Sequence, residues 1–369
     1  MATFLINASN IKQGGGVQVT QSICSQLSKF EEHHFVVVLS NGIDATDKSL
    51  GENVEVFRYD IKHSLKTVLL GCDSYLDSLT LEKHIDAVLT VFGPSLWVPR
   101  VPHLCGFARA QLLLRVDGYS PSIKDRIMYN AWKWLFKKSS DTFYTENAFI
   151  SKQLPTIFGK VKVYTVTNYY NQVFDQSEKW NRSINLPEFD GVTCLSVSSH
   201  YPHKNFEIMI GVSQYLQKQY PEFNFRFVLT FKENEMPVPD EVKEHFLFVG
   251  KVDVAECPYL YGQSDIMFMP TLMECFTATY PEAMRMKVPI VTTDLEFARG
   301  LCGDGACYYN ALDAKAAAEA IYKVATDKEY ARKLVESGGK KLLTYDNYEQ
   351  RAKKLIRILE DISQKRLYA

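Results

Sequence analysis

The sequence lacks the marks of several large classes of protein. Its formal net charge is −1 over 369 residues, so no overall positive field favours a nucleic-acid partner. No stretch approaches the roughly 20 apolar residues that cross a bilayer. The N-terminal segment MATFLINASN lacks the charged region and the long apolar run of a signal peptide. We therefore predict a cytoplasmic protein that binds no nucleic acid.

Cysteine is present, but not in the spacing that metal or disulfide frameworks use. The eight cysteines show no C-x-x-C pair, and most of them lie in apolar runs. Closely and regularly spaced cysteines are typical of zinc sites and of small secreted domains. We therefore expect reduced cysteines in the core of the protein. Internal repeats and low-complexity segments are absent as well.

The length and the pattern of apolar runs predict an α/β protein with two domains. A chain of 369 residues with 46% hydrophobic and 23% charged residues has ample core for two globular domains. Short apolar runs of strand type alternate with helical patterns in both halves. The polar stretch 176–190 indicates a linker, which places the boundary between the domains near residues 170–185.

One stretch of the second half carries two carboxylates at a predicted sheet edge. Residues 265–269 form a short apolar run that ends at Pro270, and 288–292 form another. A strand, a loop, a short helix and a parallel strand make a crossover unit, whose strand-end loops share the edge where such sheets bind ligands. Glu274 lies in the loop, and Glu282 lies in the first helical turn.

The two carboxylates differ in what their local sequence explains. Thr279 and Glu282 have the spacing of a capping box, in which Glu282 would only stabilise the start of the helix. Glu274 has no such local partner, and a free carboxylate in an apolar loop is costly unless it is hydrogen-bonded. Sugar hydroxyls would be a suitable partner for Glu274.

A glycine-rich loop follows the first predicted strand. Gly14, Gly15 and Gly16 lie between a strand at residues 3–7 and a helix at 17–30. Such a loop suits either a tight turn or the approach of an anion to the free N–H groups of the helix. The spacing is not G-x-G-x-x-G, which disfavours a dinucleotide site and hence a Rossmann oxidoreductase.

These features resemble a known family of enzymes. Glu274-Cys275-Phe276, followed after five residues by Glu282, is similar to the E-x7-E signature of the retaining GT-B glycosyltransferases, in particular glycosyltransferase family 4. The glycine loop precedes this signature in the family's order, and the resemblance covers roughly residues 3–360. Thr277 replaces a usual Gly of the family, and Ser199 replaces a usual Arg.

The resemblance implies an architecture for the whole chain. It implies the GT-B fold, with two Rossmann-like α/β/α domains that face each other across a cleft. Residues 1–175 would form the N-terminal domain on the acceptor side. Residues 185–345 would form the domain that binds the nucleotide-sugar donor. The C-terminal helix within 346–369 would cross back to the N-terminal domain.

The resemblance also implies a reaction. It implies transfer of a sugar, with retention of configuration, from a UDP- or GDP-linked donor to a glycan or lipid-linked glycan acceptor, in bacterial surface polysaccharide synthesis. It implies no metal and no other cofactor, and the sequence has no Asp-x-Asp pair of the kind that metal-dependent transferases use. The alternatives are a sugar-nucleotide epimerase or hydrolase of the same fold and a non-catalytic binding member of a glycan-assembly complex.

The resemblance assigns roles to individual residues of the second domain. Glu282 would bind the ribose hydroxyls, and Glu274 would lie against the donor sugar and stabilise developing positive charge. Lys204 would neutralise the diphosphate together with the glycine loop, although a solvated loop lysine is the alternative. The remaining donor-site positions are Phe276, Thr277 and Ala278 through their backbone N–H groups, Val252 through its backbone toward the base, and Ser199 at the position of the family's Arg.

The first domain offers one candidate catalytic residue. Family members often have a His in the loop after the strand predicted here at 104–107, whereas His103 precedes that strand. Arg109 is the nearest charged residue after the strand, so we take Arg109 as the candidate. For His103 we expect a structural role, with a contact to the donor sugar as the alternative.

Residues 124–138 combine five cations with large apolar side chains, among them Tyr129, Trp132, Trp134, Leu135 and Phe136. On a helix, this composition gives an apolar aromatic stripe that is edged by positive charge. Such a helix either docks on an anionic membrane surface or packs on its own sheet with a solvated basic face. The first case would place the protein at the cytoplasmic face of the membrane as a peripheral protein.

Overall fold

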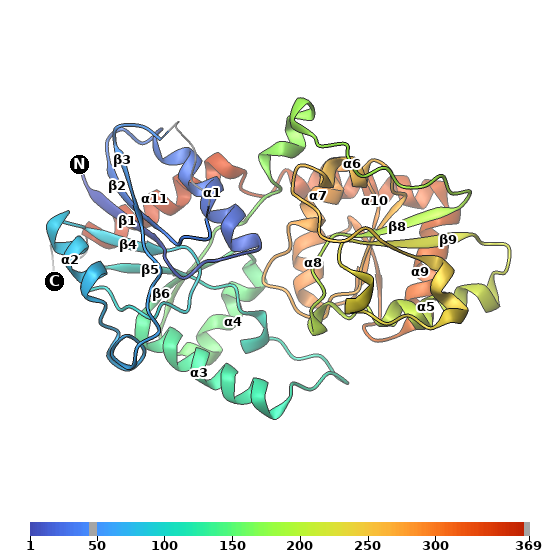
Figure 1. The fold of residues 1–369 in the computed structure, drawn as a ribbon, viewed down its shortest axis with the longest axis horizontal. Helices are drawn as coiled ribbons and strands as arrows, with labels where there is room; N and C mark the ends of the chain where they lie inside the picture. The colour runs from blue at the N-terminus through green and yellow to red at the C-terminus, as the bar shows by residue number, and fades with distance from the viewer. Residues whose placement is uncertain (44–49, 365–369) are drawn as a thin grey trace. The chain divides into compact units, whose positions relative to one another are not determined.

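The protein is described by a computed structural model that covers residues 1–43 and 50–364 (Figure 1). The chain divides into two compact units. Unit 1 comprises Met1–Leu114, Ser120–Asn168 and Asp346–Ala369, and unit 2 comprises Arg115–Tyr119 and Tyr169–Tyr345. Of the C-terminal segment expected at 346–369, residues 365–369 lie outside the described part.

Unit 1 is built on a seven-stranded parallel sheet with the order β3-β2-β1-β4-β5-β6-β7. Its strands are β1 (Thr3–Ala8), β2 (His34–Leu39), β3 (Val54–Arg58), β4 (Ala87–Thr90), β5 (His103–Gly106), β6 (Thr142–Thr145) and β7 (Lys162–Thr165). Its α-helices are α1 (Gly15–Leu27), α2 (Ser74–Glu82), α3 (Ile123–Ser139), α4 (Ala148–Phe158) and α11 (Tyr348–Gln364).

Helices cover both faces of this sheet, as the sequence of β1 requires. Phe4 and Ile6 point into a core that also contains residues of α1 and α11. Leu5, between them, points into the opposite core, with residues of α2 and α3. Because alternate residues of a strand face opposite sides, a strand buried on both faces is apolar throughout. Figure 1 shows α11, from the end of the chain, beside α1, from its beginning.

Unit 2 repeats the same plan with a six-stranded parallel sheet of order β10-β9-β8-β11-β12-β13. Its strands are β8 (Val192–Ser196), β9 (Phe225–Leu229), β10 (Phe246–Phe248), β11 (Ile266–Met269), β12 (Ile290–Thr293) and β13 (Ala306–Tyr309). Its α-helices are α5 (Ile208–Gln219), α6 (Cys257–Tyr261), α7 (Thr279–Met286), α8 (Glu296–Cys302), α9 (Ala314–Thr326) and α10 (Lys328–Leu342).

Both units therefore have Rossmann-like topology, which confirms the predicted α/β class. In each unit the strand order reverses at one point, between β1 and β4 in unit 1 and between β8 and β11 in unit 2. The loops that follow the two strands at such a reversal diverge to opposite faces of the sheet and leave a crevice, which is the usual ligand site of open α/β sheets.

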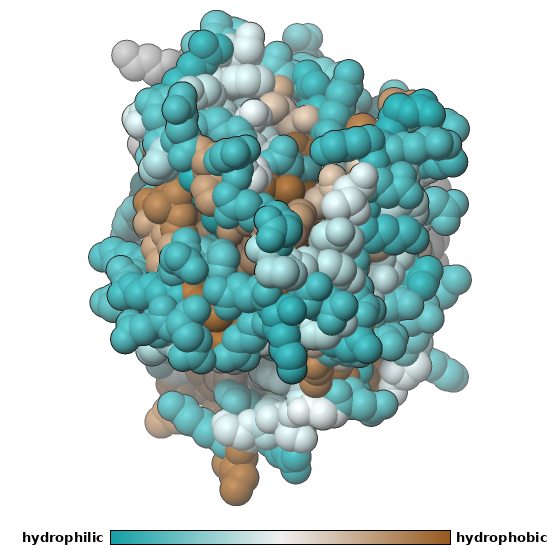
Figure 2. Space-filling model, turned by 90° about the vertical axis from the view of Figure 1, so that its right-hand side faces the viewer, coloured by the Kyte–Doolittle hydropathy of each residue, from teal (hydrophilic) through white to brown (hydrophobic). Residues whose placement is uncertain are grey.

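Within the described residues, no helix combines the length and the apolar character needed to cross a membrane. Figure 2 shows one face of the molecule, on which hydrophilic residues cover most of the surface and hydrophobic residues form small patches. Large apolar side chains that are exposed occur mainly in unit 1, among them Leu65, Leu70, Ile123 and Ile127.

Candidate active site

The predicted donor-site residues gather at the strand reversal of unit 2. β8 and β11 are hydrogen-bonded neighbours in the sheet. The loop after β8 carries Ser199 and Lys204, and the loop after β11 carries Glu274 and runs into α7. Parallel strands end at one edge of the sheet, so these two loops meet where topology alone predicts a ligand.

Glu274 and Lys204 form a buried ion pair between these loops. The Lys204 Nζ donates to Glu274 Oε1, and the two side chains are only 10% and 11% exposed. Thr271, in the loop after β11, donates its hydroxyl to the same Oε1 over 3.0 Å. The structure thus brings together two residues that are 70 positions apart in the chain. A charge in such a place requires a partner, because burial removes its water.

Backbone contacts hold the two loops in register. Lys204 ends a short turn of 3₁₀ helix, Pro202–Lys204. The carbonyl of His203 in this turn accepts the Leu272 N–H at 2.8 Å and the Thr271 hydroxyl at 3.3 Å. Asn205 follows with φ 55°, in the left-handed region that an Asn tolerates better than most residues. The position of the Lys204 ammonium is therefore fixed by the loop that carries its partner.

Glu282 lies in α7 and is buried, with 5% of its surface exposed. Its Oε2 is 3.1 Å from the Tyr261 hydroxyl. Burial raises the pKa of Glu282 to about 7, although the hydrogen bond from Tyr261 opposes this rise. A carboxyl of this kind readily forms hydrogen bonds to ligand hydroxyls, because few protein donors satisfy it.

The capping-box interpretation of Glu282 is wrong. The helix α7 begins at Thr279, and Ala278 occupies the N-cap position without a side-chain hydrogen bond. The Thr279 hydroxyl pairs instead with the Thr277 hydroxyl over 2.9 Å. Glu282 is therefore one turn into the helix, where its side chain cannot close on the N-cap amide.

The segment between Glu274 and α7 presents backbone donors. Phe276 packs edge-on against Tyr345, with ring centroids 6.0 Å apart. Within the described part of the chain, the N–H groups of Phe276, Thr277 and Ala278 donate to no protein acceptor. Successive unsatisfied N–H groups ahead of a helix attract anions and polar oxygens.

Hydrogen bonds from the neighbouring strand, β12, fix the position of this segment. The Thr293 hydroxyl of β12 donates to the Thr271 carbonyl over 2.7 Å. The Thr292 hydroxyl donates to the Met269 carbonyl over 2.8 Å, and it also pairs with the buried Tyr280 hydroxyl at 2.7 Å. These bonds tie both ends of the Glu274 loop to the sheet.

Two other predicted residues of unit 2 contribute less to this cluster. Ser199 is exposed, and its carbonyl accepts the Ser198 hydroxyl. It brings no charge to the site. Val252 is half-buried in the loop after β10, next to Gly250, whose φ is 75°. Its place at the same sheet edge follows from the parallel order of the strands.

The glycine loop lies at the strand reversal of unit 1. Gly14 precedes the first turn of α1 with φ 72°, a conformation that L residues rarely adopt. A Cβ on Gly14 or Gly15 would meet no atom within 4 Å, whereas one on Gly16 would lie 3.1 Å from the side chain of Ile11. Packing is therefore tight only at Gly16, and the open space at Gly14 and Gly15 leaves the backbone accessible.

Arg109 follows β5 and is partly buried. Its guanidinium lies over the Trp132 ring of α3, 4.2 Å from the centroid. His103, by contrast, lies inside the unit, where its ring contacts the Thr90 hydroxyl and the Ser139 carbonyl, each at 2.8 Å. Burial lowers the pKa of His103 to about 4. These contacts support the structural role expected for His103.

The basic aromatic helix predicted at 124–138 is α3. It packs on unit 1 through its C-terminal half, where Leu135 and Phe136 are buried. Its N-terminal half exposes Ile123 and Ile127, which are 80% and 68% accessible. Trp134 is 45% exposed. The C-terminal half thus fits the interpretation of a helix packed on its own unit, and docking on a membrane stays a prediction.

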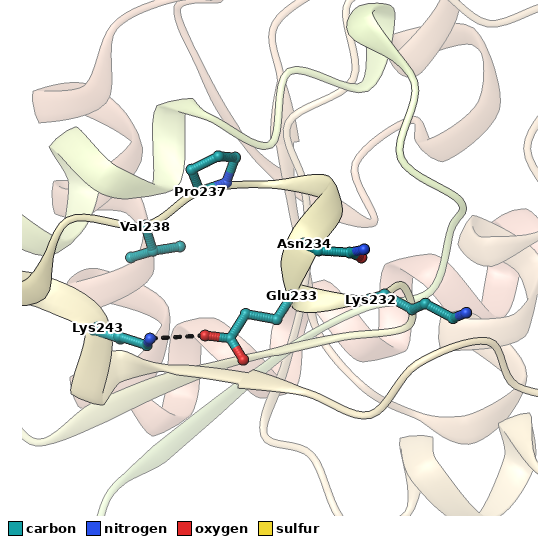
Figure 3. Close-up of a pocket in the computed structure, with 6 residues that line it drawn as sticks. All are labelled: Lys232, Glu233, Asn234, Pro237, Val238 and Lys243. Atoms are coloured by element: carbon teal, nitrogen blue, oxygen red, sulfur yellow. Dashed lines mark ion pairs between the residues drawn. The ribbon is translucent and has the colours of Figure 1, made fainter.

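An open pocket of about 590 Å³ lies elsewhere in unit 2 (Figure 3). In the close-up, Lys243 and Glu233 point toward each other and form an ion pair at 2.8 Å. The pocket is lined by Lys232, Glu233, Asn234, Pro237, Val238 and Lys243. None of the predicted site residues belongs to it, and its charged groups are largely exposed, so it does not define the candidate site.

The sequence did not reveal several residues that shape the cluster. Thr271 and Tyr261 provide the hydrogen bonds to Glu274 and Glu282, and Tyr345 supports Phe276. No motif or periodicity connects Tyr261 with a residue 21 positions later. For Thr271, the sequence offers only a weak indication of a role in the site, which is its position directly after the proline that follows β11.

Comparison with known proteins adds a family likeness for unit 2. Residues 177–341 match the model of the family described as Glycosyl transferases group 1. A curated relative, an uncharacterized glycosyltransferase of Haemophilus influenzae, is 24% identical over 146 residues. That match covers 35% of this chain and 41% of the relative's length.

Solved structures show the fold of the whole chain. Anabaena Alr3699/HepE in complex with UDP-glucose superposes with a TM-score of 0.66 at 13% identity, covering 98% of this chain and all (100%) of the other. WaaG, a glycosyltransferase involved in lipopolysaccharide biosynthesis, superposes with a TM-score of 0.65 at 14% identity, covering 98% and 99%. The chain therefore has the α/β fold of the GT-B glycosyltransferases, as predicted.

Proposed function

We propose that the protein is a retaining glycosyltransferase that needs no metal and that takes its sugar from a UDP- or GDP-linked donor. The observation that carries this proposal is the buried Lys204–Glu274 pair at the strand reversal of unit 2. A cation and a carboxylate at this edge match the two halves of a nucleotide sugar, which are an anionic diphosphate and a ring of hydroxyls. The family match of residues 177–341 and the GT-B fold support the same activity.

The donor would bind unit 2 through its three parts. Glu282 accepts hydrogen bonds from the ribose, and the loop at Val252 lies beside the base. Lys204 exchanges its bond with Glu274 for bonds to the diphosphate, helped by the N–H groups of Phe276, Thr277 and Ala278. These groups stabilise the negative charge that develops on the leaving diphosphate, which is where electrostatic catalysis acts. A relative of the same fold was solved with UDP-glucose, which supports a donor of this class.

Glu274 would act on the sugar itself. Once Lys204 turns to the diphosphate, the Glu274 carboxylate is free to accept hydrogen bonds from sugar hydroxyls. Its negative charge also stabilises an oxocarbenium-like transition state on the sugar ring. From unit 1 we assign Arg109 and the Gly14–Gly16 loop to the same reaction, as the sequence predicts.

The acceptor we propose is a glycan or lipid-linked glycan of a bacterial surface polysaccharide, and the setting is the cytoplasmic face of the membrane. The exposed half of α3 supports this proposal, because Ile123 and Ile127 lie beside the exposed cations Lys124 and Arg126. Lys124→Glu combined with Arg126→Glu should reduce sedimentation with vesicles containing phosphatidylglycerol. Unchanged sedimentation would contradict membrane contact through α3, without bearing on the transferase reaction.

Thermal shift with nucleotide sugars tests the proposed donor site first. UDP-glucose, GDP-mannose, UDP and GDP are added to the full chain, with and without EDTA, because a ligand of the native state raises the melting temperature. We expect a shift with one nucleotide class that EDTA does not change. Glu282→Ala should lose the shift, whereas Glu319→Gln, an exposed control in α9, should keep it.

Product analysis then separates transfer from its alternatives. Glu274→Gln should retain the nucleotide-induced shift and lose transfer to acceptor, because it removes the charge against the sugar and leaves the ribose site intact. A free sugar or an epimerised nucleotide, formed without acceptor, would indicate a hydrolase or an epimerase. Absence of a shift with every nucleotide would favour a non-catalytic binding protein, an alternative that Ser199 and Thr277 support because they replace usual residues of the family.

A further inference from the structure

The candidate donor site contains one well-placed lysine, and a diphosphate carries two negative charges. Ser199 is the residue five positions before Lys204, and it is neutral and exposed. Three nearby polar residues of the same loop could supply the missing interaction: His200, His203 and Asn205. The structure separates them by what each side chain already contacts.

Two of the three residues are engaged or inaccessible. The ring of His200 bonds to Glu207 at 2.9 Å and lies 5.2 Å from the ring of Phe231. Asn205 is neutral, and its Nδ2 is buried without a hydrogen-bond partner. Neither residue presents a cation to the space beside Lys204.

His203 is the remaining candidate for the second ligand of the diphosphate. In the described part of the chain, its ring nitrogens make no hydrogen bond to protein. The ring stacks on Tyr201, with centroids 5.7 Å apart and planes within 10° of each other. Its carbonyl is anchored on the Glu274 loop through Leu272 N–H. The backbone is thus fixed and the ring is oriented by stacking, while both nitrogens stay available to a ligand.

We propose that His203 is the second ligand of the donor diphosphate, and that its imidazole takes up one proton from solvent when the nucleotide sugar binds. This inference rests on the proposed function, since it concerns the same donor site. It names the group that replaces the missing cation and makes donor affinity depend on pH. The proton returns to solvent when the diphosphate leaves.

The charges around His203 agree with proton uptake. Burial lowers the pKa of His203, Glu274 raises it and Lys204 lowers it, with burial the largest effect, so the ligand-free site favours the neutral ring. A diphosphate beside the ring adds negative charge and raises the pKa of the imidazole. Between the pKa of the free site and that of the complex, donor binding weakens by up to about tenfold for each unit that the pH rises.

Isothermal titration calorimetry measures this proton directly. UDP-glucose and GDP-mannose are titrated into the full chain at pH 7 in buffers with different ionisation enthalpies. Their diphosphates are diesters and do not titrate near neutrality, so protons taken up come from groups of the protein. We expect uptake of up to one proton in the wild type, its loss in His203→Gln and its retention in His200→Gln.

A second titratable group has to be separated from His203. Glu282, with a pKa of about 7, can also change its ionisation on binding. Glu282 is present in both wild type and His203→Gln, so the difference in proton uptake between these two proteins reports the imidazole. His203→Asn, checked by circular dichroism, serves if His203→Gln does not fold.

The outcomes distinguish the inference from the proposed function. If a nucleotide sugar binds with equal proton uptake in wild type and His203→Gln, the role of His203 is overturned. The proposed donor site is not affected by that result. The same conclusion follows if the wild type binds and takes up no proton. Failure of both nucleotide sugars to bind overturns the proposed function and the inference together.

Discussion

Replacement of Glu282 by Gln should stabilise unit 2 at alkaline pH and leave its stability at acidic pH unchanged. Glu282 is buried, and its carboxyl contacts the Tyr261 hydroxyl. Gln has nearly the same shape, and the Tyr261 hydroxyl can bond to its amide. The substitution therefore removes the ionisation of this side chain while it preserves the packing.

The size of the effect follows from the pKa of Glu282. Burial raises this pKa from 4.5 to about 7. A carboxyl whose pKa is raised by folding stabilises the protein fully below the unfolded pKa, and this contribution is lost as the pH rises through the folded pKa. The loss occurs between about pH 4.5 and pH 7. At roughly 1.4 kcal/mol for each pKa unit, it amounts to about 3 kcal/mol at pH 8.

Thermal unfolding at pH 5, 6, 7 and 8 measures the difference. At pH 8 the melting temperature of Glu282→Gln should exceed that of the wild type by several degrees, since about 1 kcal/mol corresponds to about 2–4 °C for a unit of this size. At pH 5 the difference should be smaller, below about 1 kcal/mol, because most of the loss occurs above that pH. Tyr261→Phe should lose more stability toward alkaline pH than the wild type, because the hydrogen bond from Tyr261 lowers the pKa of Glu282.

A difference between Glu282→Gln and wild type that stays constant from pH 5 to pH 8 would refute this reasoning. It would mean that Glu282 ionises at its ordinary pKa or stays protonated throughout. The exposed control Glu319→Gln should show no pH-dependent difference. Glu282→Gln should also bind nucleotide more weakly, so a variant that is more stable and less able to bind would identify Glu282 as a functional carboxyl.

Three further predictions concern packing and buried charge. Lys204→Met should destabilise unit 2 by about 3 kcal/mol or more, because Glu274 is left as a buried unpaired charge. In urea unfolding, the double variant with Glu274→Gln should regain much of the lost stability. Gly106→Ala should destabilise unit 1 by about 3 kcal/mol or more, since its Cβ would lie 1.9 Å from the backbone oxygen after β4, whereas Gly15→Ala, with open space around it, should be nearly neutral. Glu146→Gln should raise the melting temperature above pH 7 and do so much less at pH 5, because burial raises the pKa of Glu146 to about 7.

The strands and the two sheets could be predicted from the sequence, because buried parallel strands are apolar throughout. The segment 64–81 is also apolar, but its structure does not follow from that, for the converse reason. Leu65, Leu69 and Leu70 are exposed there, around a π-helical turn at Lys66–Leu70, so their hydrophobicity does not report burial. The helix α2 that follows has its N-cap at Asp73, whose side chain accepts two N–H groups.

The candidate site was predictable in its residues and not in its contacts. No sequence motif pairs Glu274 with a neighbour, so the sequence implies a partner elsewhere, and the structure adds the nearby Thr271 hydroxyl. That the partner is Lys204 depends on the adjacency of β8 and β11, which joins loops far apart in the chain. The capping-box error has a similar origin, since Thr277 and Thr279 pair with each other through a contact that residue spacing does not encode.

The ion pair between Lys204 and Glu274 also sets a condition on any ligand. Each charge is satisfied by the other, so a molecule that binds only one of them leaves its partner buried and alone. A free phosphate binds the Lys204 ammonium and leaves the Glu274 carboxylate without a partner. A free sugar binds the carboxylate and leaves the ammonium without one. Only a molecule that carries an anion and hydroxyls at the right separation compensates for both. The ion pair of the ligand-free site thus disfavours binding of either half of a nucleotide sugar alone.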